Sequence, residues 1–332
     1  MRACLALAIF AVAFQVYACI ATYAARHTAM PDNFGNFERV RAALPPASLD
    51  RPVSFMVVGD TRSKGSFEGL AEDIRASSPD FIVILGDWVD DGSPDQHAFF
   101  RQEASEYDFS CPVFFTPGNH DVDPRDYPLD RFETDYGPRN FSFVYKDSIF
   151  IFISNLDKRF SNEASINYLQ SFDPETIASY RNRFVFMHIP PWISPDIKER
   201  HTKDETRLVE IFQKLNINYV MAADFHGYNR TRSEGIEYII TGGGGARLDT
   251  TNGKQFHHAV SIRFDEKMLS EKILPAKSIF EVSDWIEYNS VVYIGPFIIG
   301  HAYTVILINM IVLTALFLIV RAGKQGKDRR IP

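Results

Sequence analysis

The sequence is poor in cysteine and carries no cluster of basic residues in its central region. Only three cysteines occur among 332 residues, and two of them, Cys4 and Cys19, lie in an apolar N-terminal stretch. The region expected to fold therefore holds Cys111 alone and cannot close an internal disulfide, which excludes a disulfide-stabilised scaffold. The formal net charge is −7. Because a nucleic-acid-binding protein more often carries a clustered basic face, no nucleic-acid partner is expected.

Charge is also scarce at both ends of the chain. Residues 1–23 are almost uncharged after Arg2 and are typical of a signal peptide or a signal anchor. Residues 302–320 give 19 positions without a charge, which is long enough for a transmembrane helix, with a buried core helix as the alternative. By the positive-inside rule the basic tail 321–332 is expected in the cytoplasm. Residues 275–301, before the predicted helix, are expected to form a juxtamembrane segment. The central region is then predicted to lie outside the cytoplasm, in the periplasm if the source is bacterial.

The central region alternates strand and helix signals. Residues 24–51 are mixed in composition and are predicted to be a linker. From residue 52 to residue 274, apolar runs of strand length alternate with amphipathic stretches such as 204–215, where apolar side chains recur at helical spacing. This pattern predicts an α/β domain with one mixed sheet or two packed sheets.

Five of the apolar runs end in polar side chains. In α/β sheets, sites form outside the carboxyl ends of the strands, so these side chains can meet at one rim. Each residue alone is more typical of a turn, a helix cap or a hydrogen-bonded core histidine. Taken together, their oxygen and nitrogen donors suit divalent ions and predict a metal site. The residues concerned are Asp60, Asp87, Asp90, Asn119, His120, His188, Asp224 and His226.

Two other features have simpler interpretations. His97 lies on a polar helical stretch and is expected to be exposed to solvent. The four glycines at 242–245 lack the Lys-Ser/Thr pair of a nucleotide-binding loop. We expect them to let the backbone approach the metal rim closely.

The motifs at the strand ends resemble those of the calcineurin-like metallophosphoesterase family. In order along the chain they read GDTR, GDWVD, GNHD, MHIPP and ADFH, and the resemblance covers residues 52–274. The segment FHGYNR, followed by TGGGGARL, is also similar to the purple-acid-phosphatase-like branch. Asp90 stands where that branch often has a ligating tyrosine, so an oxidised iron–tyrosinate centre is not implied. The resemblance implies two packed mixed β-sheets flanked by helices.

The resemblance also implies a centre of two divalent ions, of manganese, zinc, iron or magnesium. Asp87 matches the carboxylate that bridges the two ions. Asp60 and His226 match ligands of one ion, and Asn119 and His188 match ligands of the other. Two close cations lower the pKa of a shared water, so that a metal-activated hydroxide exists near neutral pH and attacks phosphorus.

Two positions depart from the family pattern. Asp224 replaces the first histidine of the last motif; it can still coordinate, and its hard oxygen shifts the preference toward manganese or magnesium. Arg62 replaces the first-motif histidine and cannot coordinate, because its guanidinium has no available lone pair. Three outcomes are open: the ion at Asp60 binds with fewer protein ligands, Arg62 binds substrate phosphate in a bidentate way, or Arg62 replaces that cation outright. We expect the first two together.

The predicted function is that of a membrane-anchored phosphoesterase acting outside the cytoplasm on a phosphate monoester or diester. Its substrate would be a phosphorylated small molecule or a lipid. His120 matches the histidine that assists the leaving oxygen, Asp90 matches the carboxylate that holds it, and Arg62 is predicted to contact phosphate. The alternatives are a catalytically weak binding module and a lipid-head-group pyrophosphatase at the membrane surface.

Overall fold

The computed structural model divides the chain into two compact units, which are treated separately. One comprises Ala29–Glu281, and the other comprises Met1–Thr28 with Val282–Pro332. The described residues are 2–47, 51–62, 67–156, 160–191, 200–249, 255–265, 268–276 and 282–328.

The first sheet of the larger unit has five strands in the order β11-β10-β1-β2-β3. Strands β1 (Val53–Val58), β2 (Phe81–Ile84) and β3 (Val113–Phe115) are parallel. Strands β10 (His258–Phe264) and β11 (Leu269–Pro275) extend the sheet by antiparallel pairing. The carboxyl ends of β1, β2 and β3 therefore lie at the same edge.

The second sheet has six strands in the order β4-β5-β6-β7-β9-β8. Its four central strands are parallel, and its edge strands β4 and β8 pair antiparallel with their neighbours. Both sheets are thus mixed. The strands are β4 (Phe141–Tyr145), β5 (Ser148–Phe152), β6 (Asn182–Phe186), β7 (Tyr219–Ala222), β8 (Tyr228–Ser233) and β9 (Ile236–Thr241).

Phenylalanine side chains from alternate strand positions fill the space between the two sheets. The Phe55 and Phe81 rings of the first sheet meet the Phe150 ring of the second edge-on, with centroids 5.7 and 5.2 Å apart. Edge-to-face rings in this range attract one another beyond their burial. Because side chains alternate across a strand, neighbouring residues such as Met56 point to the opposite face.

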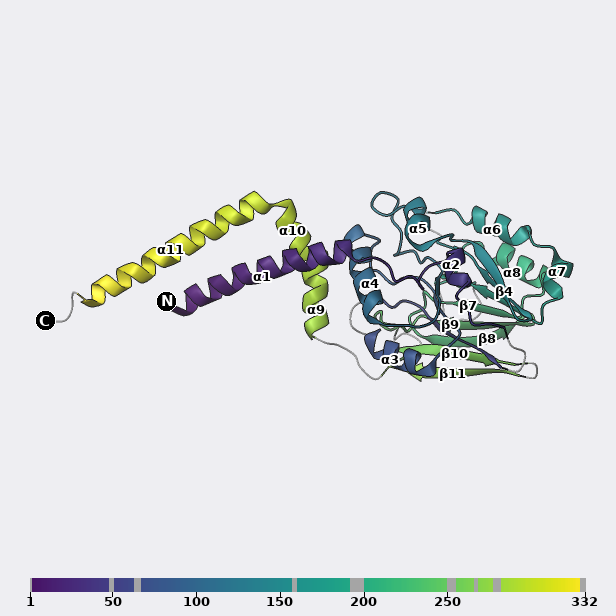
Figure 1. The fold of residues 1–332 in the computed structure, drawn as a ribbon. Helices are drawn as coiled ribbons and strands as arrows, with labels where there is room; N and C mark the ends of the chain where they lie inside the picture. Colours follow the sequence, from purple (N-terminus) through teal and green to yellow (C-terminus); the bar gives the residue numbers. More distant parts are fainter. Residues whose placement is uncertain are drawn as a thin grey trace. The chain divides into compact units, whose positions relative to one another are not determined.

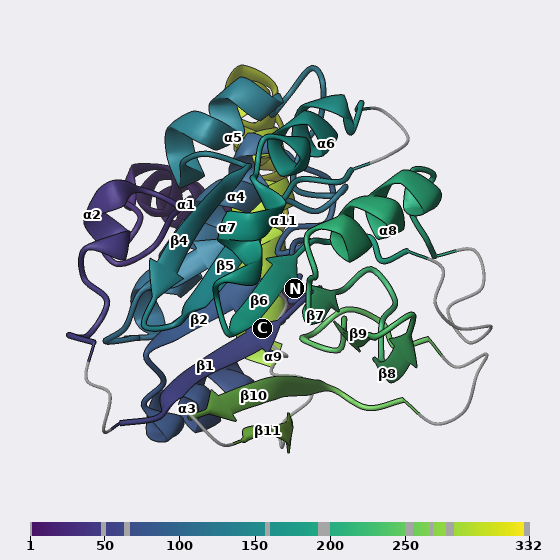
Figure 2. The same ribbon diagram turned by 90° about the vertical axis from the view of Figure 1, so that its right-hand side faces the viewer.

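Helices cover the outer face of each sheet, which makes four layers (Figure 1, Figure 2). Helices α3 (Glu68–Ser77), α4 (Pro94–Glu106) and α5 (Leu129–Tyr136) pack on the first sheet. Helices α6 (Glu163–Gln170), α7 (Pro174–Ala178) and α8 (Glu205–Lys214) pack on the second. The prediction of two mixed sheets flanked by helices is confirmed.

The stretch predicted as a linker differs from expectation, because part of it packs into the larger unit. Phe34 forms a β-bridge with Val113, at the free edge of β3. The buried Asn36 amide satisfies the backbone N–H and C=O of Phe115, each at 2.9 Å. Val40, in the short helix α2 (Glu38–Arg41), is also fully buried. The Asn36 side chain thus holds this part of the predicted linker against the end of β3. Such a contact cannot be predicted from composition.

The smaller unit is helical. It contains α1 (Arg2–His27), α9 (Val282–Asn289), the π-helical turn η2 (Ser290–Ile294), α10 (Gly295–Gly300) and α11 (Ala302–Asp328). Two of its segments, Ala3–His27 and Ala302–Ala322, are long and apolar enough to cross a membrane. The end of the predicted basic tail, 329–332, lies outside the described residues.

The apolar helices of this unit pack on one another through small and polar groups. The buried Thr22 hydroxyl of α1 donates to the Ser290 carbonyl at 3.2 Å. At Gly295, an added Cβ would lie 2.0 Å from the Thr22 hydroxyl oxygen, so only glycine fits there. Asn309 of α11 donates to the Gln15 side-chain oxygen of α1 at 2.6 Å. Close approach at small residues and hydrogen bonds between apolar helices are typical of membrane-helix packing.

Candidate metal centre

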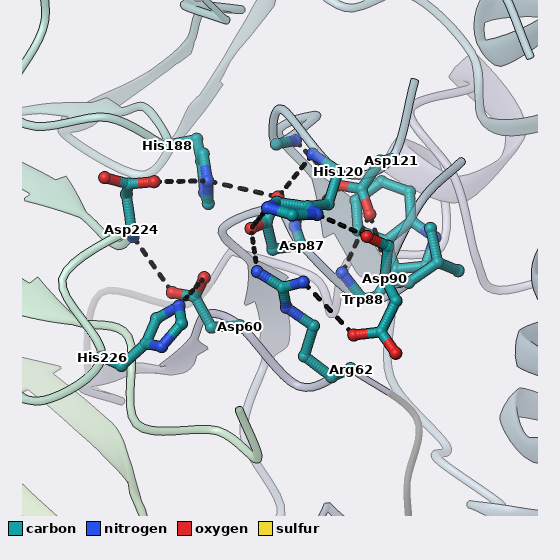
Figure 3. Close-up of polar contacts among 12 residues, drawn as sticks. Asp60, Arg62, Asp87, Trp88, Asp90, His120, Asp121, His188, Asp224 and His226 are labelled. Carbon is teal, nitrogen blue, oxygen red and sulfur yellow. Dashed lines mark hydrogen bonds and ion pairs between the residues drawn. The ribbon is translucent and has the colours of Figure 1, made fainter. Parts of the chain in front are cut away.

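The polar strand ends of both sheets meet at one place (Figure 3). Strands β1 and β2 of the first sheet lead to Asp60 and Asp87, while β6 and β7 of the second lead to His188 and Asp224. Ligand atoms of Asp60, Asp87 and His188 all lie within 4.8 Å of one another, and these three residues are buried. We call the following six residues the donor group: Asp60, Asp87, Asn119, His188, Asp224 and His226.

One side of the donor group consists of Asp60 and His226. The His226 Nε2 atom lies 3.4 Å from Asp60 Oδ1. The other ring nitrogen, Nδ1, lies 2.7 Å from the Arg247 carbonyl, which can only accept, so Nδ1 carries a proton and Nε2 is the nitrogen directed at Asp60. Asp60 Oδ2 accepts the backbone N–H of Asp224 at 3.0 Å. Burial raises the pKa of Asp60.

The other side consists of Asp87, His188 and Asp224. The His188 Nε2 atom lies 3.3 Å from Asp87 Oδ1 and 3.7 Å from Asp224 Oδ1. Its Nδ1 donates to the Leu85 carbonyl at 2.6 Å, which again directs Nε2 to the centre. Burial lowers the pKa of His188, but the carboxylates of Asp87 and Asp60 outweigh it and raise that pKa to about 10. The site is therefore one that favours positive charge.

Among the residues the structure describes, several atoms of the donor group that could bind a metal are buried and have no hydrogen-bond partner. They are Asp60 Oδ1, Asn119 Oδ1, His188 Nε2 and His226 Nε2. A buried polar atom without a hydrogen-bond partner costs about 1–3 kcal/mol of folding stability, so such atoms usually contact a bound water, ion or ligand. The two oxygens carry lone pairs, and each ring nitrogen offers one when a bound cation takes the place of its proton; atoms of these types bind zinc, manganese or iron. The residues present thus fit a divalent metal ion.

Left-handed backbone conformations occur at the three acids of the donor group. Asp60, Asp87 and Asp224 have φ angles of 56°, 54° and 59°. Arg62 shares this left-handed conformation, with φ at 57°. Non-glycine residues adopt this conformation at a cost.

Two glycines allow the backbone to come close to these acids. A Cβ at Gly118 would lie 2.3 Å from Asp87 Oδ1, and one at Gly242 would lie 2.5 Å from Asp60 Oδ2. The interpretation of residues 242–245 as a place of close backbone approach is confirmed at Gly242.

A buried carboxylate that sequence reasoning gave no role supports the centre from behind. Asp121 accepts the backbone N–H groups of Asp87 and Gly118, each at 2.7 Å, and those of Trp88 at 2.9 Å and Val89 at 3.2 Å. It thereby locks the loop after β2 to the loop after β3. Its position as the last residue of the GNHD motif was the available signal.

His97 also differs from its prediction. It is fully buried, lies 2.8 Å from the Tyr136 hydroxyl and 2.9 Å from the Asp121 carbonyl, and stacks on Tyr127 at 3.6 Å between ring centroids. Burial lowers the pKa of His97 to about 3, so it is neutral at physiological pH. The stretch looks polar in sequence because its buried face includes polar side chains such as Gln96, whose Oε1 accepts the Asp90 backbone N–H at 2.6 Å.

The predicted leaving-group pair is arranged differently from expectation. The His120 Nδ1 contacts the Asp90 backbone carbonyl, and the Asp90 carboxylate lies 3.3 Å from Arg62 Nη1. His120 Nε2 lies 3.9 Å from Asp87 Oδ2, and the His120 side chain is 40% exposed. A pocket of about 270 Å³ opens beside it, lined by Asp90, Asp91, Asn119, His120, Val122, Leu156 and Phe160.

Arg62 is held within the site by two carboxylates. Its Nη2 donates to Asp87 Oδ2 at 2.7 Å, and its Nη1 donates to Asp90 Oδ1 at 3.3 Å (Figure 3). Only 9% of its surface is exposed. The guanidinium is therefore a fixed positive charge against one oxygen of the central carboxylate.

Comparison with known proteins places the fold among phosphoesterases. The sequence model of the calcineurin-like phosphoesterase family matches residues 53–228. A probable cyclic nucleotide phosphodiesterase from Pseudoalteromonas sp. strain SM9913 is 39% identical over 49 residues, which is 15% of this chain and 19% of that protein. The similar stretch thus spans under a fifth of that relative.

Solved structures show the same fold at low identity. A purple acid phosphatase from yellow lupin seeds (Lupinus luteus) has a TM-score of 0.54 at 16% identity, over 71% of this chain and 55% of that one. A dimetal phosphatase from Danio rerio has a TM-score of 0.52 at 11% identity, over 69% of this chain and 98% of that one. The anchor protein GAP50 of the Plasmodium inner membrane complex has a TM-score of 0.51 at 12% identity, over 74% and 96% of the two chains.

Proposed function

Because this chain belongs to the calcineurin-like phosphoesterase family, we propose that it is a metal-dependent enzyme that hydrolyses a phosphate monoester or diester. The observation that carries the proposal is the set of buried, unpartnered lone-pair atoms contributed by both sheets. Metal-dependent hydrolysis of a phosphate ester uses bound cations beside a proton donor, and the donor group together with His120 would supply both.

The donor group is proposed to hold the metal. A bound divalent ion would lower the pKa of water and offset the negative charge on phosphoryl oxygens. The resemblance in sequence predicts two such ions, of manganese, zinc, iron or magnesium. The tautomers of His188 and His226, set by the Leu85 and Arg247 carbonyls, support ligand roles for their Nε2 atoms.

His120 is proposed to assist the leaving group. The Asp90 carbonyl accepts a hydrogen bond from His120 Nδ1, so Nε2 is the nitrogen that would face a bound ester. A protonated Nε2 would donate its proton to the departing oxygen, and the neutral ring would take it back from solvent. The pocket beside His120 would receive the departing alcohol; its lining by Val122, Leu156 and Phe160 suits an alcohol with an apolar part.

The two long apolar helices support membrane anchoring. We propose that α1 and α11 lie in the bilayer and that the phosphoesterase unit lies outside the cytoplasm, with the basic C-terminal tail inside. The same helices favour a second candidate, hydrolysis of a phosphorylated lipid head group at the membrane surface. The first candidate predicts turnover of soluble esters, and the second predicts turnover only when the lipid is presented in a micelle or vesicle.

The experiment uses the full chain in detergent. Bound divalent ions are measured, and hydrolysis of an aryl phosphodiester and an aryl phosphomonoester is assayed with manganese, zinc or magnesium. Asp87→Asn should lower turnover on the order of 10³-fold, because several kcal/mol of metal-derived stabilisation is lost. Asp126→Asn, which changes an exposed carboxylate on the loop before α5, serves as the control. Unchanged turnover in Asp87→Asn would refute the site.

A catalytically inactive binding module is the outcome left if no ester is hydrolysed. Arg62 favours it, because a guanidinium on Asp87 competes with a metal for that carboxylate. Bound metal without turnover on soluble or vesicle-borne esters would support this module and contradict an enzyme.

A further inference from the structure

Arg62 has a position in the site that neither its sequence context nor the proposed reaction accounts for. It is nearly buried and makes ion pairs of 2.7 Å with Asp87 and 3.3 Å with Asp90. A guanidinium stays charged in proteins and cannot be displaced by deprotonation. A buried charge of this kind is stable only when it is paired, and here its main partner is the central carboxylate of the donor group.

The two oxygens of Asp87 are used differently. Oδ2 accepts from Arg62 Nη2. Oδ1 accepts the backbone N–H of His120 at 2.9 Å and lies 3.3 Å from His188 Nε2. A divalent cation brought to Oδ2 would therefore meet a fixed positive charge within hydrogen-bonding distance of the same atom, and repulsion at such distances is strong away from bulk water. Only the Oδ1 face of Asp87 is open to an ion.

The donor atoms themselves converge on one position. Those of Asp60, Asp87 and His188 lie within 4.8 Å of one another, which is the spacing of ligands around a single ion. Two of the three remaining members of the donor group flank this trio: His226 Nε2 is 3.4 Å from Asp60, and Asp224 Oδ1 is 3.7 Å from His188.

We infer that Arg62 is a resident second cation, and that the chain holds one divalent ion, between Asp60, Asp87 and His188. The guanidinium takes the place of the second ion predicted from the family resemblance. This inference rests on the proposed function and specifies its cations: one exchangeable metal ion and one permanent guanidinium, both beside the phosphoryl group. It also makes the site dependent on a single metal-binding equilibrium.

The test is the number of ions bound by the full chain in detergent. The protein is loaded with excess Mn²⁺, freed of unbound metal, and its manganese is measured by mass spectrometry. Wild type should bind one ion per chain, and Arg62→His should bind two. Arg62→Gln, which removes the charge without adding a ligand, separates relief of repulsion from gain of a donor: it should bind a second ion more weakly than Arg62→His. Asp126→Asn should bind one ion, as wild type does.

Electron paramagnetic resonance of the same samples gives a second readout that needs no turnover. Wild type should show the six-line signal of isolated Mn²⁺, and Arg62→His should show the spin coupling of two neighbouring ions. Two tightly bound, coupled ions in wild type would overturn the inference and leave the proposed function standing. No bound ion together with no ester hydrolysis would overturn the proposed function itself. The wild-type measurement stands even if an Arg62 variant fails to fold.

Discussion

The two sides of the donor group are supported unequally. Asp87 and His188 are fastened by the Asp121 carboxylate and the Leu85 carbonyl, and both of these residues are fully buried. The His226 ring beside Asp60 is held through the backbone carbonyl of Arg247, an exposed residue. Support from packed, buried residues fixes a ligand more accurately than support from an exposed loop. The Asp87 side should therefore set metal affinity, and the Asp60 side should adjust it.

The largest expected effect is a difference in metal affinity between variants of His188 and His226. His188→Ala should lower metal affinity on the order of 10³-fold, because it removes a fully buried ligand from the convergent trio. His226→Ala should lower it about 10- to 100-fold, the scale of a supporting contact. Titration calorimetry with Mn²⁺ measures both, and the control is His201→Ala, which changes a half-buried histidine paired with Glu205 outside the donor group. Equal losses in the two variants would remove the distinction between the sides.

The support behind the Asp87 side can be weakened without touching a ligand. Asp121→Asn replaces one accepting oxygen by an NH₂ group that opposes backbone N–H donors, so metal affinity should fall about 10- to 100-fold. The free energy of unfolding should fall by about 1–3 kcal/mol, since buried donors lose their acceptor. Calorimetry and denaturant titration measure the two effects. If affinity is unchanged while stability falls, Asp121 maintains the fold but does not position the metal ligands.

A smaller effect depends on pH through His97, which contacts the Asp121 carbonyl. Its folded-state pKa of about 3 lies below the ordinary value of 6.5, so the unfolded chain binds its proton first. The contribution of neutral His97 is complete above pH 6.5 and is lost as pH falls from 6.5 toward 3. His97→Gln should reduce the slope of unfolding free energy against pH in this window by up to about 1.36 kcal/mol per pH unit. An identical slope in the variant would show that another group titrates there.

The strand ends were predictable because two simple rules act together. Apolar runs become strands, and the carboxyl ends of parallel strands meet at one edge, so Asp60, Asp87, His188 and Asp224 could be assigned to such edges from the sequence. Within each sheet these rules bring Asp60 to Asp87 and His188 to Asp224, but they do not give the packing of the two sheets that brings the two pairs to one place. The resemblance to a family supplied expectations of roles that neither rule contains.

Other features depend on side-chain direction, which strand position does not give. The predicted phosphate contact of Arg62 stays a prediction; its ion pair with Asp87 depends on a left-handed backbone angle two residues after another one at Asp60. The burial of His97 depends on Tyr127 and Tyr136, which lie on a loop and a helix about 30 or more residues away in sequence. Such long-range partners leave no periodic signal.

The left-handed angles at Asp60, Asp87 and Asp224 have a consequence for stability. An L-residue in this conformation costs roughly 1–2 kcal/mol, and glycine avoids most of that cost. The chain accepts this backbone cost at each of three acids that line the centre, so the carboxylates are placed there at the expense of stability.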